Sequence, residues 1–175
     1  MGGWDATMLG PVVTITPYHL LSCGLFMAEV APSSGTFVAA NRAVYIPFRI
    51  PAPMVVTQLF SMNGAAVSGN IDVGIYDKDG TRLVSSGSTA QAGTSTIQAF
   101  NITDTLIGPG QFYLAVAMDN ATGTLLRIFL FPANGTKVMG VAQQASAFAL
   151  PATATFATES SGYFPMIGLT GRAVL

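Results

Sequence analysis

Residues 71–85 read IDVGIYDKDGTRLVS. Apolar Ile71, Val73 and Ile75 alternate with other residues, which is the period of a β-strand that has one buried face. The Asp-Lys-Asp-Gly run at 77–80 predicts a tight turn, because glycine adopts the positive φ that such turns often require. The residues that follow predict the return strand, so this stretch predicts a β-hairpin.

Short runs of β-branched or alternating apolar residues recur on both sides of this hairpin. Turn signals separate the runs, among them the Asn134-Gly135 pair, which is typical of a two-residue hairpin turn. Pro47 lies inside one run and predicts an edge or bulged strand. No stretch has the 3.6-residue period of a capped helix. The pattern predicts an all-β sandwich or barrel, whose other strands cover residues 12–16, 43–50, 54–60, 95–100, 111–118, 124–131, 136–141, 148–156 and 163–169.

The run at 111–118 is apolar on both faces. Such a strand lies in the middle of its sheet, because each face must be covered. One face carries Tyr113, Ala115 and Ala117, and we expect a neighbouring subunit to cover it. Together with the low number of charges, this predicts a homo-oligomer, most simply a homotrimer.

We expect two parts in the chain, an extended N-terminal arm at residues 1–40 and a β-sandwich domain at residues 41–175. The arm contains Gly2, Gly3 and three prolines, which interrupt regular secondary structure, and it has no continuous strand pattern. It also contains an apolar row that an adjacent subunit could bury. The predicted interface residues are Trp4, Met8, Leu9, Val12, Val13 and Ile15.

The composition excludes several classes of protein. The chain has 175 residues, with seven basic and eight acidic side chains and a net charge of −1. Nucleic-acid binding requires a basic surplus, so we predict no nucleic-acid partner. One cysteine excludes a disulfide scaffold. Residues 6–28 carry no charge but follow no basic residue and contain two prolines, so we predict neither a signal peptide nor a membrane span.

We predict no enzymatic activity, no cofactor and no metal. His19 and Cys23 are four residues apart, but the proline at position 17 argues against a helix that would align them for catalysis. No Gly-x-Ser-x-Gly motif is present.

The acidic residues Asp77, Asp79 and Asp104 are expected in turns or at strand ends rather than as a catalytic pair. The 77–80 run also lacks the flanking oxygen ligands of a calcium loop. Arg127 lies inside an apolar strand and is expected to be paired there.

Residues 73–87 and 106–117 together carry a resemblance to a known group of domains. The "IYDxxG" hairpin and the "GxFYLAVA" strand resemble jelly-roll domains in virion proteins of tailed bacteriophages, namely decoration proteins, head fibres and tail-fibre modules. The resemblance implies an antiparallel, jelly-roll-like β-sandwich and a location in the virion. It implies a non-enzymatic structural role that decorates or cements the capsid, with the major capsid protein or another virion protein as partner. The alternative is a tail-fibre or receptor- and glycan-binding module, which an exposed aromatic cluster beside a polar groove would favour.

Overall fold

The computed structural model describes residues 18–21, 32–129, 135–159 and 161–174. These residues form antiparallel sheets and one helix, α1 (Gly135–Val138), which confirms the predicted all-β class. The strands are β1 (Tyr18–Leu21), β2 (Ser33–Thr36), β3 (Arg42–Ile50), β4 (Met54–Met62), β5 (Asn70–Asp77), β6 (Arg82–Ser85), β7 (Thr89–Ala90), β8 (Ile97–Ile107), β9 (Gly110–Met118), β10 (Thr124–Phe129), β11 (Ala142–Gln144), β12 (Ala157–Thr158), β13 (Tyr163–Pro165) and β14 (Ile167–Ala173).

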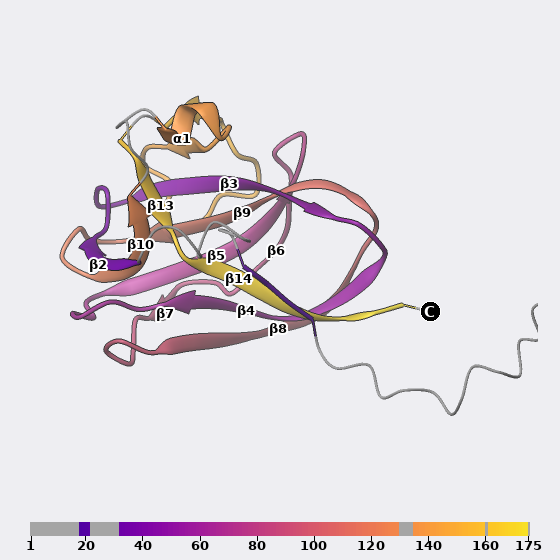
Figure 1. Cartoon of the computed structure of the whole chain (residues 1–175), viewed down its shortest axis with the longest axis horizontal. Helices are drawn as coiled ribbons and strands as arrows, with labels where there is room; N and C mark the ends of the chain where they lie inside the picture. Colours follow the sequence, from indigo (N-terminus) through magenta and orange to yellow (C-terminus); the bar gives the residue numbers. More distant parts are fainter. Residues whose placement is uncertain (1–17, 22–31, 130–134, 160, 175) are drawn as a thin grey trace, which may run out of the picture.

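The main strands form two stacked layers (Figure 1). One sheet has the order β1-β14-β4-β8, and the other contains β3-β9-β5-β6. In chain order these eight strands are β1, β3, β4, β5, β6, β8, β9 and β14. Numbered from one to eight in that order, they give the sheet orders 1-8-3-6 and 2-7-4-5. Each strand therefore pairs with its counterpart from the other end of the chain, as in a long hairpin that has been rolled up. This is the strand order of a jelly roll, and it confirms the predicted sandwich.

The predicted hairpin at 71–85 contains β5 and β6, the two middle strands of the eight, and its turn is the point where the long rolled hairpin reverses. Ile75 of β5 lies opposite Val84 of β6, and the turn lies between them. The Asp77 side chain accepts hydrogen bonds from the backbone N–H groups of Asp79 and Thr81, at 2.9 and 2.8 Å. Gly80 has φ 88°, the positive value that was predicted for this turn. The local sequence is therefore sufficient to explain this element.

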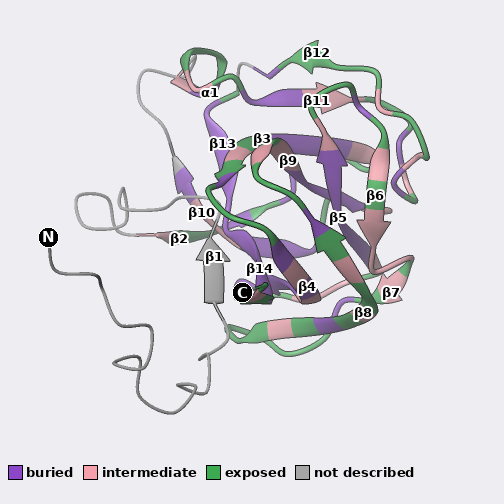
Figure 2. Cartoon of the chain, turned by 90° about the vertical axis from the view of Figure 1, so that its right-hand side faces the viewer, coloured by how far each residue is buried: buried purple, intermediate pink, exposed green. Residues whose placement is uncertain are grey.

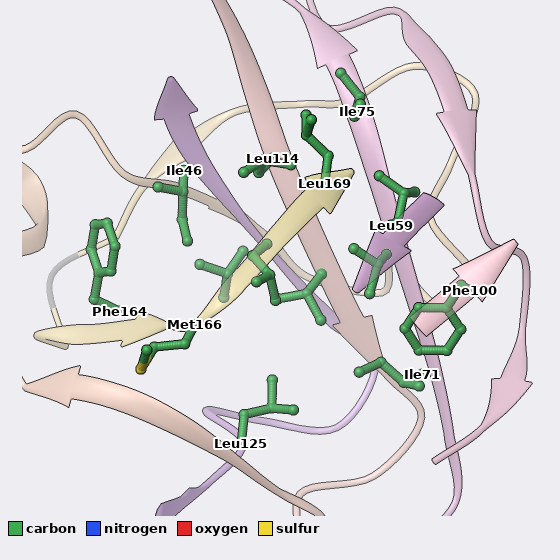
Figure 3. Close-up of a cluster of buried hydrophobic side chains, with 14 of the residues drawn as sticks. Ile46, Leu59, Ile71, Ile75, Phe100, Leu114, Leu125, Phe164, Met166 and Leu169 are labelled. Carbon is green, nitrogen blue, oxygen red and sulfur yellow. The ribbon is translucent and has the colours of Figure 1, made fainter. Parts of the chain in front are cut away.

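The core lies between the two sheets. Val44 and Ile46 of β3 lie opposite Val116 and Leu114 of β9, and all four side chains are buried. Figure 3 shows side chains of both sheets meeting in this layer, among them Leu59 of β4 and others of β5, β8 and β14. Each large apolar side chain that is fully buried contributes about 1.5–3 kcal/mol before ordering costs.

A second apolar layer lies on the outer face of the β3-β9-β5 sheet. There Ala115 and Ala117 of β9 are fully buried with Tyr45 and Tyr76. Figure 2 shows the buried residues of β3, β9 and β5 inside the molecule and the mostly exposed residues of β8 at its surface. Strand β9 pairs with β3 on one side and β5 on the other, which confirms its predicted central place.

The hairpin predicted at Asn134-Gly135 is wrong for the residues that the structure describes. Residues 135–138 form α1, and the strand predicted at 136–141 is absent from this stretch. The Thr136 hydroxyl donates to the Glu159 carbonyl oxygen at 3.1 Å, and the Val141 N–H donates to the Thr136 carbonyl oxygen at 3.0 Å. The bond to Glu159, in a distant segment, and the local bond from Val141 stabilise a helical turn that the Asn-Gly signal does not indicate.

The strand predicted at 148–156 is also wrong. This stretch crosses the β5–β6 hairpin instead, and its backbone bonds to the turn of that hairpin. The Ala154 N–H donates to the Gly80 carbonyl oxygen at 2.8 Å, and the Arg82 N–H donates to the Ala152 carbonyl oxygen at 2.9 Å. Residues 148–156 have the composition of a strand, but they cover the sheet instead of adding a strand to it.

Two described segments of the predicted arm belong to the sheets. In β1, Tyr18 lies opposite Gly171 of β14, and in β2, Ser34 lies opposite Leu126 of β10. The jelly roll thus includes β1, whereas β2 belongs to a separate sheet of order β13-β10-β2. The division at residue 40 stays a prediction for the rest of the arm, and the strand predicted at 12–16 lies outside the described residues.

A glycine in β14 provides a test of how closely the sheet is packed. A Cβ atom at Gly171 would lie 2.8 Å from the Val55 carbonyl oxygen, at the bulge of the β14–β4 ladder. We expect Gly171→Ala to lower the free energy of unfolding by about 1–3 kcal/mol, because the crowded backbone must shift. Urea unfolding measures this, with Gly108→Ala as the control, since a Cβ at Gly108 meets nothing within 4 Å. Equal unfolding midpoints in the two variants would contradict the assigned packing.

Candidate binding groove on the outer face

The outer face of the β3-β9-β5 sheet is covered by the chain itself. Residues 145–156, here called the crossing segment, place Ala147 and Leu150 over Ala115 and Ala117. The expectation that a neighbouring subunit covers this face is therefore wrong for these two alanines. This face therefore no longer supports the predicted homotrimer, which stays a prediction.

A buried carboxylate holds the crossing segment in place. Asp72 of β5 is fully buried, and its Oδ2 atom accepts a hydrogen bond from the Leu150 N–H at 3.0 Å. Its Oδ1 atom accepts one from the Ser86 hydroxyl at 3.2 Å. The Arg82 guanidinium donates to the Leu150 carbonyl oxygen. Both backbone groups of Leu150 are thus satisfied from the β5–β6 hairpin and its continuation.

Two tyrosine hydroxyls add to this attachment. Tyr45 donates to the Gln144 side-chain oxygen at 3.0 Å, and Tyr76 donates to the Pro151 carbonyl oxygen at 2.5 Å. Burial raises the pKa of Tyr45 to about 12 and raises the pKa of Tyr76 as well. Both hydroxyls therefore stay protonated and keep donating at neutral pH, which is a structural rather than a catalytic role.

A first hollow opens where this cover ends. Strand β11 reaches only as far as Tyr45, so within the described residues β3 has no second neighbour from Pro47 onward. Pro47 has no N–H to leave unpaired at such an edge, which agrees with the predicted edge position. The hollow has a volume of about 270 Å³, and it is lined by Pro47, Phe48, Arg49, Lys78, Gln111, Phe112 and Tyr113.

A second hollow adjoins the first. It has a volume of about 330 Å³ and is lined by residues of α1, β11 and β12 and by Phe156. The rings of Phe156 and Tyr113 lie 4.6 Å apart between the two hollows. A Cβ atom at Gly140, in the second hollow, would lie 3.6 Å from Pro47 Cγ in the first. We call the two hollows together the outer groove.

The groove contains two cations that have no partner among the described residues. Arg49 lines the first hollow and Lys137 the second, and neither makes an ion pair or side-chain hydrogen bond with the described residues. Lys78 does make one, to Asp79 at 2.7 Å, and both of these side chains are exposed. None of the described residues that line the groove is acidic. The groove can therefore attract an anion beside two aromatic rings.

The acidic side chains serve structural contacts elsewhere. The candidates Asp77, Asp79 and Asp104 do not come together, and Asp104 lies within β8 rather than at a strand end, because that strand is longer than predicted. Each of the six described carboxylates accepts a hydrogen bond. The donors are the Leu150 N–H for Asp72, the Thr81 N–H for Asp77, Lys78 for Asp79, Arg172 for Asp104, the Asn70 N–H for Asp119 and the Ser161 N–H for Glu159.

The remaining predicted residues are placed as follows. His19 lies in β1 opposite Thr170, and Cys23 lies outside the described residues. The guanidinium carbon of Arg127 lies 5.6 Å from the centre of the Tyr163 ring. The described residues contain no group of three or more His, Cys, Asp or Glu that could hold a metal ion. The predicted interface residues Trp4, Met8, Leu9, Val12, Val13 and Ile15 all lie outside the described residues.

No helix within the described part of the chain is long and apolar enough to span a membrane.

Sequence reasoning missed the groove residues Arg49, Lys137 and Phe156. They come from three segments that are far apart in the chain, and each is unremarkable in its local sequence. Only the uncovered edge of β3 brings them to one surface.

The chain matches no protein-family model and no curated protein sequence. Among solved structures, it is similar to a chain of the infectious bursal disease virus Gx strain structure, with 12% identity and a TM-score of 0.32 over 100% of this chain and 41% of that chain. It is also similar to the infectious bursal disease virus VP2 subviral particle, with 12% identity and a TM-score of 0.33 over 92% of this chain and 42% of that one. The chain thus spans less than half the length of these viral proteins.

The attachment through Asp72 can be tested by substitution. Asp72→Ala leaves the buried Leu150 N–H without its acceptor, which costs about 1–3 kcal/mol of unfolding free energy. Asp72→Asn keeps an acceptor oxygen, and we expect it to cost less. Chemical unfolding of the two variants measures the difference. An Ala variant as stable as the Asn variant would contradict the role of this carboxylate.

The same carboxylate predicts a pH dependence. Burial raises the pKa of Asp72 above its ordinary value of 3.8, an effect that hydrogen bonds from Leu150 and Ser86 only partly offset. The folded chain then holds this proton to a higher pH than the unfolded chain does, so the contribution of Asp72 to stability falls as the pH rises above 3.8. Unfolding measured across acidic pH should show that the wild type loses stability relative to Asp72→Asn as the pH rises above 3.8, because the asparagine does not titrate.

Proposed function

We propose that this protein is a non-enzymatic structural protein of a tailed-phage virion, which decorates or cements the capsid as a homotrimer bound to the major capsid protein. The observation that carries the proposal is the jelly-roll strand order, found in a chain whose described carboxylates all serve structural contacts. Jelly rolls of this kind are common in viral capsids and in lectins. A fold alone does not decide a function, so the surface features must support one.

The edge strand β8 supports an assembly role. It is eleven residues long and ends the β1-β14-β4-β8 sheet. Its side chains Ile97 and Leu106 are 61% and 66% exposed, which is high for large apolar residues. A long exposed edge strand invites pairing with another chain unless it is protected. A neighbouring subunit of the particle would supply that protection.

The row of apolar residues near the N-terminus supports a role in attachment. Because β1 is a strand of the jelly roll, the proposed anchor is limited to residues 1–17. This stretch contains Trp4, Met8, Leu9, Val12, Val13 and Ile15, which are the residue types that dominate buried contacts between subunits.

A tail-fibre or receptor-binding module is the second candidate. The outer groove favours it, because Tyr113 and Phe156 form an aromatic pair beside polar and charged side chains. Location on the particle separates the two candidates. Cryo-microscopy of the native virion should place the chain on the capsid surface, and density on the tail alone would overturn the decorating role.

Truncation tests the proposed anchor. Removing residues 2–17 should leave a folded domain that no longer attaches to particles, because the jelly-roll strands remain. Removing residues 2–30 should also destabilise the fold, because β1 is lost from the edge of its sheet. Circular dichroism and unfolding report on the fold, and occupancy on particles stripped of this protein reports on attachment. Full occupancy of the shorter truncation would show that the anchor lies elsewhere.

A further inference from the structure

We propose that the outer groove binds an acidic oligosaccharide. Its carboxylates would meet Arg49 and Lys137, and its sugar rings would pack on Tyr113 and Phe156. The inference does not depend on the virion role, since particle localisation tests that role separately.

The charge of the groove is the first argument. Of the seven cations, Arg42, Lys78, Arg82 and Arg172 donate to side chains or carbonyl groups of the chain, and Arg127 lies over an aromatic ring. The remaining two cations, Arg49 and Lys137, both line the outer groove. Both side chains are exposed, and no described residue that lines either hollow is acidic, so the groove favours an anionic ligand. A guanidinium binds a carboxylate through two parallel hydrogen bonds, which gives direction as well as affinity.

The aromatic rings are the second argument. Phe156 is 36% exposed and Tyr113 is half-buried, and their rings are tilted by 37°. A sugar ring has an apolar face of C–H groups and an edge of hydroxyls. The rings of Tyr113 and Phe156 suit the apolar face. Gln111 in the first hollow and Thr158 in the second can hydrogen-bond to hydroxyls.

The site is already formed in the free chain. The Phe156 ring meets the Tyr45 ring edge-on, at 5.1 Å and 81°, and the Tyr45 hydroxyl is itself fixed by Gln144. Two residues earlier, the backbone of Ala154 is bonded to Gly80. A ligand therefore does not have to order these rings, and the entropic cost of binding is lower.

The shape of the groove favours more than one sugar unit. The two hollows adjoin at Pro47 and Gly140, and Arg49 lines one of them and Lys137 the other. A saccharide that carries a carboxylate on every ring would place one in each hollow. An acidic peptide has carboxylates as well, but it lacks the flat apolar face that the aromatic pair would contact.

The test uses the full chain and a short oligogalacturonate, which carries a carboxylate on every ring. Titration calorimetry and NMR should show saturable binding, and a neutral malto-oligosaccharide of the same length should bind at least tenfold more weakly. Arg49→Gln and Lys137→Gln should each weaken oligogalacturonate binding about tenfold or more, because each removes a charge-assisted hydrogen bond. Phe156→Ala should weaken it as well. Circular dichroism checks that each variant is folded.

Arg172→Gln is the matched control. It removes one exposed positive charge on the other sheet, where Arg172 pairs with Asp104 at 2.9 Å, and it should leave binding unchanged. Equal weakening by Arg172→Gln would show general charge attraction and overturn the site. Absence of saturable binding at millimolar oligogalacturonate, or equal binding of the neutral saccharide, would overturn it too. Binding of poly-glutamate as tight as that of oligogalacturonate would overturn the saccharide class.

Discussion

Strand β9 carries apolar side chains on both of its faces. Exposing either face to water would cost free energy, so both must be covered. Leu114 and Val116 point into the sandwich, while Ala115 and Ala117 point to the outside of the same sheet, and all four are buried. The β1-β14-β4-β8 sheet covers the inner face, as the partner sheet of any jelly roll does. The outer face requires a third layer, and the crossing segment provides it. The path of residues 145–156 follows from this requirement.

The groove lies where the third layer ends, because there the outer face of the sheet is left uncovered. The crossing segment is held by Asp72, whose carboxylate satisfies the Leu150 backbone deep in the sheet. Farther along β3, no other described strand follows β11, and the outer face opens into the groove. The groove thus arises because the covering segments are too short to reach the whole outer face of the sheet. A structural role for the whole domain and a binding role for this one surface are therefore compatible.

Apart from Asp72 and Glu159, the buried polar side chains of the described residues are uncharged. Asn63 is fully buried, and its amide donates to the Ala92 carbonyl oxygen at 2.6 Å and to the Gln98 side chain at 3.0 Å, while its oxygen accepts from Gln91 at 3.2 Å. Gln91 in turn donates to the Thr124 carbonyl oxygen at 2.8 Å. Neutral amides can be buried at low cost when each group has a partner. This network joins the end of β4, the start of β8 and β10, so a chain with few charges still has a specific interior.

The local sequence by itself determined the β class, the hairpin at residues 71–85 and the central place of β9, because periodicity and turn chemistry act over a few residues. It also predicted an edge or bulged strand at Pro47, and Pro47 lies beyond the part of β3 that pairs with β11. Only the tertiary structure decided that Gly135 begins a helix and that residues 148–156 form a cover, since both depend on bonds to distant segments. The groove has the same origin. Its residues share no local pattern, and the end of one short strand against β3 brings them together.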